Sequence, residues 1–370
     1  MADEGGSGMV RGNAFPAIFK SHPGMYSLIA MVRTYAEAGV DQSRKASHIS
    51  AIVKELSFRR KGAGRQMSGI GHFTGLIDFG KHALSLCTDG VGTKLIVATM
   101  MKKWDTVGID CVAMNVNDMI CIGAEPLAFV DYFAVEKYDE EIARQVGIGL
   151  NEGARRANVS IIGGEVAILP EMIHDFDLAG TCLGMVEKSK IIAGKSIRPG
   201  DVIIGLSSTG IHSNGLTLAR RVFRDAGMSV GDRLPGGNGR IGEALLEPTA
   251  IYVRPVMAVL RKHEVHGIAH FTGGGLSNIV RLNEKVEFAV TDPLDPQPVF
   301  HSIQKLAGID DTEMYRTFNM GMGMCVVAPE DEAKGIIRTL GKSVKAEVVG
   351  HVRKGSGVSL MKKGVRFEAY

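Results

Sequence analysis

The sequence predicts a mixed protein, α/β or α+β, built from two domains. Its 370 residues are more than a single hydrophobic core usually supports. Helical and strand patterns are interspersed without a regular βαβ series, an order that favours mixed domains. Hydrophobic residues make up 45% of the chain and charged residues 22%, which is the balance of a globular protein with sizeable cores.

The apolar pattern changes between Lys188 and Gly200, where charged residues interrupt it and a Pro-Gly-Asp turn follows. Glycine and proline of this kind mark a turn between structured segments. We therefore place the domain boundary here. The expected segments are a mobile extension over residues 1–25, an N-terminal domain over 26–188 and a C-terminal domain over 189–370.

In the N-terminal domain, Asp139 followed by Glu140 and Glu141 is typical of a helix N-cap with acids in the first turn. Over residues 109–121 apolar side chains recur at helical spacing, so this stretch is expected to bury one face. Expected helices are 26–38, 43–56, one after Lys94, 109–121 and one from Glu140. Expected strands are 82–88, 128–135, 178–186 and a strand over 160–163 that ends at Gly163-Gly164-Glu165.

In the C-terminal domain the same reasoning predicts fewer elements. Residues 231–242 are rich in glycine and are expected to be exposed. The expected elements are a strand over 202–206, a helix over 216–226, a helix over 249–262 and a closing strand over 324–328.

Composition excludes several classes of function. The net charge is only +3, and no long Lys/Arg block is present, so nucleic-acid binding is not expected. The sequence contains no run of 18 apolar residues, so no membrane span is expected. The 5 cysteines are scattered, and free thiols in a reducing cytoplasm account for them best.

The run Thr88 to Lys94 places a carboxylate, two glycines and a lysine directly after an expected strand. Glycines let backbone N–H groups approach anionic oxygens, and a lysine adds positive charge. Asp89 is also suited to a bound Mg²⁺. Because the spacing of a P-loop is absent, a plain turn remains the alternative. The candidate phosphate-binding residues here are Asp89, Gly90, Gly92, Thr93 and Lys94.

Three polar residues on the expected helix 109–121, Asp110, Asn117 and Asp118, are hard oxygen ligands of the kind Mg²⁺ prefers. A solvated helix face is the alternative. Glu165, directly after Gly163-Gly164, adds a fourth candidate and shifts the balance toward Mg²⁺ holding a polyphosphate.

Two further runs have the character of anion-binding loops. His270 to Gly275 reads HFTGGG, and His212 to Gly215 follows a strand and opens a helix. Backbone N–H groups at such places bind anions. A structural role is the usual one for a single histidine. The candidates are His212, Ser213, Asn214, His270, Thr272, Gly273 and Gly274.

The loop Gly69 to Gly75 resembles the dinucleotide fingerprint only superficially, because its spacing differs and it precedes a strand. We reject a Rossmann fold. The remaining interpretations are a mobile lid over phosphates, which makes Gly69, Gly71 and Gly75 candidates, and a plain surface loop.

Taken together, these runs resemble the phosphoribosylformylglycinamidine cyclo-ligase family from about residue 26 to the end. The matching runs, some of them not discussed above, occur in the same order as in that family. The runs that carry it are YAEAGVD at 35–41, DGVGTKL at 89–95, GID at 108–110, ND at 117–118, GAEP at 123–126, GGE at 163–165, HSNG at 212–215, HFTGGG at 270–275 and YRTFN at 315–319.

The resemblance implies a fold in which the N-terminal domain pairs with its twin, and the strands of the two form a barrel in a homodimer. It implies ATP-dependent closure of formylglycinamidine ribonucleotide to aminoimidazole ribonucleotide, with ADP and phosphate released, in the cytoplasm. ATP and Mg²⁺ are the expected cofactors. The implied catalytic residues are His270, Asp118 and Lys94, and the implied metal ligands are Asp89, Asp118 and Glu165.

Other members of the wider superfamily are the main alternatives. Selenophosphate synthetase requires a reactive Cys or selenocysteine in the N-terminal glycine loop, and residues 1–86 contain no cysteine. A thiamine-monophosphate kinase stays open as a minor alternative. A non-catalytic binding protein is disfavoured, because Asp89, Asp118 and Glu165 are all present.

Overall fold

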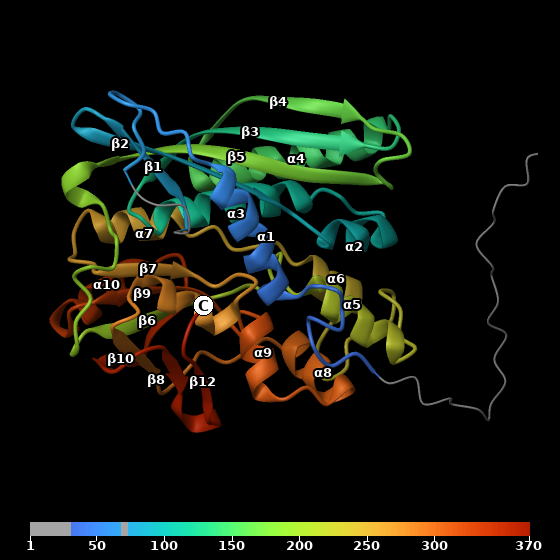
Figure 1. The fold of residues 1–370 in the computed structure, drawn as a ribbon. Coiled ribbons are helices and arrows are strands. Elements are labelled where there is room, and N and C mark those ends of the chain that lie inside the picture. The colour runs from blue at the N-terminus through green and yellow to red at the C-terminus, as the bar shows by residue number, and fades with distance from the viewer. Residues whose placement is uncertain (1–30, 68–72) are drawn as a thin grey trace, which may run out of the picture. The chain divides into compact units, whose positions relative to one another are not determined.

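The computed structural model describes residues 31–67 and 73–370. Residues 31–370 form one compact unit, and its strands form two sheets (Figure 1). The first sheet is built from residues before Lys188 and the second from residues after Asp201. The two sheets thus lie on either side of the predicted boundary.

The first sheet has five strands in the order β1-β2-β5-β3-β4. Strands β3 and β4 run parallel, and all other neighbours are antiparallel. The strands are β1 Gly75–Phe79, β2 His82–Gly90, β3 Glu125–Val135, β4 Ser160–Ile168 and β5 Phe176–Glu187.

Helices α3 (Val107–Ile120) and α4 (Glu140–Ala157) lie on one side of this sheet (Figure 1). They approach so closely that a Cβ added to Gly108 would lie 2.2 Å from the backbone N of Leu150. Only glycine allows this approach. The predicted cap is present, because the Asp139 side chain accepts hydrogen bonds from the first turn of α4. The other helices of this half are α1 Gln42–Glu55 and α2 Lys94–Met101.

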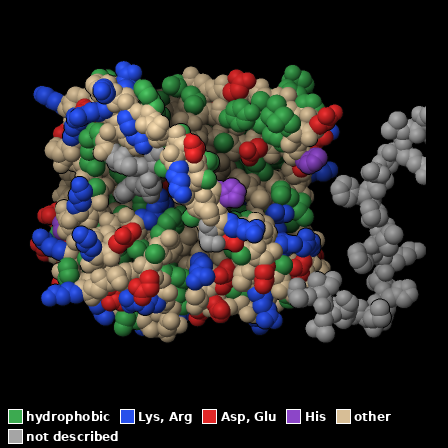
Figure 2. Space-filling model, in the orientation of Figure 1, with side chains coloured by type: hydrophobic (Ala, Val, Ile, Leu, Met, Phe, Trp, Pro, Cys, Tyr) green, Lys and Arg blue, Asp and Glu red, His purple; other side chains and the backbone are tan. Residues whose placement is uncertain are grey.

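The opposite face of the first sheet is open. Along β5, residues of one face such as Leu178 are buried, whereas those of the other are only partly buried. On the open face Leu86 is 52% exposed and Tyr132 is 42% exposed. Hydrophobic side chains gather over β3 and β4 in Figure 2. An apolar sheet face of this kind is a candidate interface.

The second sheet has seven strands in the order β12-β11-β8-β10-β6-β9-β7. Strands β8 and β11 are parallel and the rest are antiparallel. The strands are β6 Val202–Ser207, β7 Gly267–His270, β8 Val286–Val290, β9 Met322–Ala328, β10 Ala346–Lys354, β11 Val358–Leu360 and β12 Val365–Phe367.

Helices surround the second sheet, and short 3₁₀ turns join several elements. The helices are α5 Leu216–Asp225, α6 Ile241–Leu246, α7 Val253–Leu260, α8 Pro298–Ala307, α9 Asp311–Thr317 and α10 Ala333–Leu340. The 3₁₀ turns are η1 Lys188–Lys190, η2 Gly275–Leu282, η3 Glu330–Glu332 and η4 Met361–Lys363.

Three sequence predictions differ from the structure. Residues 31–38 of the first expected helix form turns, because the Glu37 carboxylate accepts hydrogen bonds from the backbone N–H groups of Arg33 and Thr34; residues 26–30 lie outside the described part. Strand β4 continues through Gly163-Gly164-Glu165, since β3 pairs with it along that length. Helix α7 begins at Val253, because residues 249–252 are held in contacts with α3.

In the part of the chain that the structure describes, no helix is long and apolar enough to cross a membrane.

A buried histidine predicts a pH-dependent stability. His266 Nδ1 lies 2.7 Å from an Asp201 carboxylate oxygen, and its Nε2 lies 2.9 Å from Glu264; Arg198 lies 4.0 Å from Asp201. Burial by itself lowers the pKa of His266, but the bonds to the two carboxylates outweigh it and raise the pKa. The stabilisation is therefore fully present below the unfolded pKa of about 6.5 and is lost as the pH rises through the raised folded pKa.

Urea unfolding at about pH 6 and about pH 9 measures this contribution. We expect the wild type to lose more stability between these values than His266→Gln. His351→Gln, which changes an exposed histidine, serves as the control and should behave as the wild type. Equal pH dependence in all three proteins would rule out the linkage.

Candidate active site

A histidine and a carboxylate from the two halves of the chain meet at the centre of the site. His270 ends β7, and its Nδ1 lies 2.8 Å from Oδ1 of Asp118 on α3. The His270 side chain is 1% exposed, and that of Asp118 is 20% exposed. An ionised Asp118 accepts a hydrogen bond from Nδ1–H, which leaves Nε2 as the ring nitrogen with a lone pair.

Asp89, near the end of β2, belongs to the same cluster. Its pKa is raised to about 6, first by burial and then by the negative charge of Asp118, while the Gly90 N–H, His270 and Lys45 act in the opposite direction. The Gly90 N–H donates to Asp89 Oδ1 at 2.8 Å. The carboxylate of Asp118 is therefore close enough to raise the pKa of Asp89. A cation between them would relieve both their repulsion and their desolvation.

The third predicted metal ligand lies elsewhere. Across the strands of the sheet, Glu165 on β4 lies opposite Tyr132 on β3, which lies opposite Ala179 on β5. These three side chains therefore point to the same face of the sheet. Asp89 is paired with Gly180, the next residue on β5, so Asp89 and Glu165 point to opposite faces of the sheet. β4 is also three strands from β2. Within the described residues of one chain, no group of three or more His, Cys, Asp or Glu is arranged to hold a metal ion.

Asp89 and Asp118 alone fit a magnesium site. Both supply carboxylate oxygens, the donors that Mg²⁺ prefers, and Mg²⁺ commonly uses one or two protein carboxylates together with substrate phosphates and water.

The HFTGGG run forms a tight turn beside this cluster. Gly275 has φ +52° and its N–H donates to the Thr272 carbonyl. Side chains hold the glycine carbonyls, since Gln42 Nε2 donates to Gly273 O at 2.8 Å and Ser277 Oγ to Gly274 O at 2.7 Å. Among the described residues, the N–H groups of Gly273 and Gly274 have no hydrogen-bond partner. This arrangement suits an anion.

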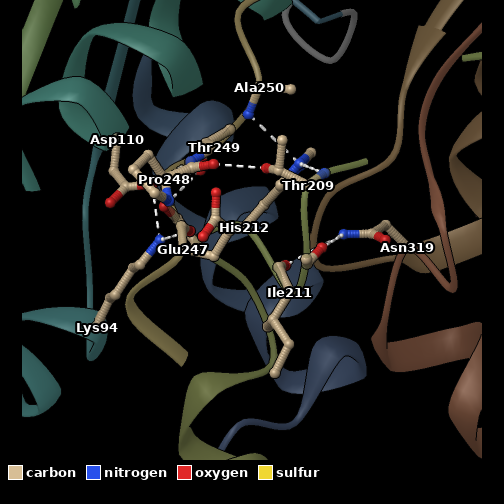
Figure 3. A network of polar contacts seen from close by, with 12 residues as sticks. Lys94, Asp110, Thr209, Ile211, His212, Glu247, Pro248, Thr249, Ala250 and Asn319 are labelled. Atoms are coloured by element: carbon tan, nitrogen blue, oxygen red, sulfur yellow. Dashed lines mark hydrogen bonds and ion pairs between the residues drawn. The ribbon is translucent and has the colours of Figure 1, made fainter. Parts of the chain in front are cut away.

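In the HSNG run, His212 is a buried brace. Its Nε2 accepts from the backbone N–H of Thr209 at 3.2 Å and of Ala250 at 3.4 Å (Figure 3). Its pKa is lowered well below the ordinary value, first by burial and then by the charges of His270 and Lys94. The ring is therefore neutral and carries its proton on Nδ1.

The rest of the HSNG run lies around this histidine. Ser213 Oγ is 3.3 Å from Thr249 Oγ1. Asn214 lies against the HFTGGG turn, with Oδ1 3.0 Å from the position that a Cβ on Gly273 would take.

Lys94 occupies an interior ion pair and not an open phosphate site. Its Nζ lies 2.9 Å from Asp110 Oδ1 and donates to the carbonyl of Glu247 at 2.6 Å (Figure 3). Both side chains are 0% exposed. Asp110 Oδ1 also accepts from the N–H and hydroxyl of Thr249. The placement favours a role in joining the two halves of the chain.

Asn117 has a similar placement. Its side chain is 0% exposed, donates to the Ala250 carbonyl at 2.8 Å and accepts from the Tyr252 N–H at 3.0 Å. The solvated face that was the alternative for this helix is absent at Asp110 and Asn117, because both are buried against the segment 249–252.

The remaining candidates are more dispersed. Thr93 Oγ1 lies 2.9 Å from Thr217 Oγ1 of α5. Gly90 ends β2, and Gly92 has φ +69° in the turn before α2. Gly75 begins β1. Gly69 and Gly71 lie outside the described residues.

Sequence reasoning did not identify several residues that reach the site from afar. Gln42 holds the Gly273 carbonyl, and Lys45 is close enough to Asp89 to lower its pKa. The Tyr35 N–H donates to Glu313 at 2.8 Å, so the YAEAGVD run is attached to the C-terminal half. Of Gln42 and Lys45, only Gln42 could have been found from the sequence, because it directly follows the YAEAGVD run. The others depend on contacts between distant segments.

Comparisons with known proteins identify the family of this chain. The family described as AIR synthase related protein, N-terminal domain, matches residues 71–186, and the C-terminal domain of the same description matches residues 198–363. The mixed two-domain fold expected from the sequence is confirmed, while the bounds at residues 26, 188 and 189 stay predictions.

Close relatives share one name. The phosphoribosylformylglycinamidine cyclo-ligase of Methanosarcina barkeri is 50% identical over 317 residues, which cover 85% of this chain and 95% of the relative. That of Methanocaldococcus jannaschii is 51% identical over 323 residues, covering 86% and 92%. The predicted family resemblance is confirmed.

Solved structures share the fold at low identity. Thiamine-monophosphate kinase from Stenotrophomonas maltophilia superposes with a TM-score of 0.60 at 19% identity, covering 86% of this chain and 96% of that one. The hydrogenase maturation protein HypE in complex with ATP gives 0.56 at 16% identity, covering 88% and 93%.

The buried ion pair predicts a large effect on stability. Lys94→Gln leaves Asp110 without its cation in the interior, which typically costs about 3–5 kcal/mol. Lys103→Gln, which removes an exposed pair with Asp105, should cost at most about 1 kcal/mol. Urea unfolding compares the two variants. A Lys94→Gln protein as stable as the wild type but with slow turnover would instead support the catalytic role expected from the sequence.

Proposed function

We propose that this chain closes the imidazole ring of aminoimidazole ribonucleotide at the expense of ATP, because it belongs to the phosphoribosylformylglycinamidine cyclo-ligase family. The observation that carries the proposal is about half identity to a named cyclo-ligase over 95% of that protein's length. The paired His270 and Asp118 beside Asp89 supply chemistry that fits it. The reaction belongs to purine biosynthesis, and all five cysteines are free thiols, which agrees with the cytoplasm as its place.

The chemistry begins with a poor leaving group. The amide oxygen of formylglycinamidine ribonucleotide attacks the γ-phosphorus of ATP and ADP departs. The amide nitrogen loses its proton, and an iminophosphate forms. The substrate's own amine nitrogen then attacks the activated carbon. Phosphate leaves with the former amide oxygen, the nitrogen loses a proton, and the ring is closed. Positioning and charge neutralisation supply most of the catalysis in such transfers.

His270 is placed to take the proton of the attacking amine. Asp118 fixes the ring through Nδ1 at 2.8 Å and favours the imidazolium that forms, which leaves Nε2 for the substrate. In this arrangement His270 is the catalytic residue that touches the substrate, and Asp118 orients it while also facing the metal.

The anionic groups of the two substrates need separate partners. Asp89 and Asp118 would hold a Mg²⁺ ion, which neutralises charge on the transferred phosphoryl group when bound. The N–H groups of Gly273 and Gly274 suit a phosphate, and Asn214 and Gln42 fix that turn. We do not include Glu165 in this set, because it lies on the other face of the sheet.

A direct assay tests the proposal. Purified protein, ATP, Mg²⁺ and formylglycinamidine ribonucleotide should yield aminoimidazole ribonucleotide, ADP and phosphate in equal amounts. The control replaces the ribonucleotide with thiamine monophosphate, on which no ADP should form. ADP without the ring product, or phosphorylation of thiamine monophosphate, would overturn the proposal.

His270→Gln separates chemistry from structure. Glutamine keeps a donor near Asp118 but cannot accept a proton, so turnover should fall at least about a hundredfold, as general-base loss commonly does. Thermal stability should change little. His301→Gln, at an exposed position on α8, is the control. A destabilised His270→Gln enzyme whose folded fraction turns over normally would make His270 a brace only.

The open face of the first sheet supports the homodimer that the resemblance implied. Packing two such faces together would cover Leu86 and Tyr132.

One chain has a mass of 39.6 kDa, and light scattering at micromolar concentration should report twice that mass. Leu86→Asp should shift the protein toward the single-chain mass. Met361→Asp changes a residue of equal exposure, 51% against 52%, in the other half and should leave the dimer intact. A single-chain mass for the wild type would remove the dimer.

A further inference from the structure

A cavity lies beside the segment 250–252, which also contacts α3 and His212. Its volume is about 490 Å³, and its walls come from the end of α4, the end of β6, the start of α7 and the residues between α10 and β10. The volume falls within the range of small-molecule sites. None of the residues assigned to the proposed reaction lines it.

The lining is strongly cationic. Arg155 and Arg156 of α4, Arg254 of α7 and Lys345 all contribute to it. Two carboxylates offset part of this charge, because Glu152 pairs with both α4 arginines at 2.7 Å and Glu347 lies 3.2 Å from Lys345. Four cations against two carboxylates leave an excess of positive charge.

Donor groups at this cavity are also in excess. Arg254 donates through Nε to Arg156 O and through Nη2 to Arg155 O, while its Nη1 has no partner among the described residues. The first residues of α7 line the cavity, so the positive dipole end of this helix, which carries no side-chain cap, lies beside it. Ser207 and Thr209 also line the wall, although the Thr209 hydroxyl already donates to the Pro248 carbonyl.

Apolar groups form the rest of the wall. Ile251, Tyr252, Pro255 and Val344 line it beside the cations. A concave site with several cations at one side and apolar contacts at the other suits a small organic anion better than a bare ion or an extended polymer. Arginine guanidinium groups bind phosphate oxygens well. Arg155 and Arg254 already use Nε and Nη2 within the protein, whereas Arg156 is bonded through Nε alone and can direct its other nitrogens to a phosphate.

We propose that this cavity is a binding site for a small phosphomonoester of the nucleoside monophosphate type. None of the groups that we propose for ATP and the ribonucleotide line it, and it is connected to them through Thr209 and the segment 250–252. On one side that segment bonds to Asn117 and His212, and on the other it lines the cavity.

Equilibrium dialysis with labelled AMP, in the presence of excess ADP and Mg²⁺, tests the proposal without relying on turnover. The informative variant is Arg156→Gln with Lys345→Gln. Both side chains are well exposed, at 44% and 58%, so folding should be retained. The matched control is Arg144→Gln. It removes an exposed ion pair with Glu141 that is also on α4, but Arg144 does not line the cavity.

At about 0.05 M salt, where surface charges are weakly screened, wild type and Arg144→Gln should each bind one more AMP per chain than the double variant, or bind it at least about tenfold more tightly. Identical isotherms for the wild type and the double variant would overturn the proposal. Equal weakening in the Arg144→Gln control would also overturn it, because general surface charge would then explain the binding. The ring-closure assay stays independent, since the double variant should turn over at the wild-type rate.

Discussion

The ion pair between Lys94 and Asp110 is the contact on which the arrangement of the site depends. Both groups are wholly buried, and isolated charges in such a place are very unfavourable. They are stable only as a pair, and the Glu247 carbonyl and both donors of Thr249 add hydrogen bonds to Lys94 Nζ and Asp110 Oδ1. Because Lys94 and Asp110 come from the first half of the chain and residues 247–249 from the second, the pair is satisfied only when the two halves are in register.

The same segment carries this constraint to the reacting groups. Residues 250 and 252 bind both ends of the Asn117 amide, and Ala250 also donates to His212. The chain from 247 to 252 therefore fixes α3 and the HSNG turn together. This accounts for the irregular conformation of residues 249–252, where the sequence pattern indicates a helix, since a helix would direct these backbone groups to each other and not to α3.

Local patterns in the sequence were sufficient for most elements of the fold. Helices α1, α3 and α4 and strands β2, β3, β5, β6 and β9 were expected close to their observed positions, because their apolar periodicity reflects the face that each one buries. The short strands β7, β8, β11 and β12 were not predicted, since three to five residues give too little periodicity to recognise.

The site was predicted less evenly, for a physical reason. Asp89 and His270 were proposed because each stands beside a glycine-rich turn, and Asp118 because it follows Asn117 on a helix with polar oxygen ligands. The structure brings these three residues together. Lys94 and Asn117 stand in equally suggestive runs, but the sequence does not show whether a charged group faces substrate or a distant segment of its own chain. Glu165 was grouped with the other carboxylates by motif, although alternation along β4 sends its side chain to the other face.

The position of Asp118 depends on the buried contacts of its neighbour Asn117. Asp118 follows Asn117 directly, so the bonds that lock Asn117 to residues 250 and 252 also set where Asp118 emerges toward β7. One residue of slippage along α3 would move the carboxylate by about 1.5 Å and rotate it by about 100°. Either change would break its 2.8 Å contact with His270. The buried polar network thus determines the geometry of the His270–Asp118 pair.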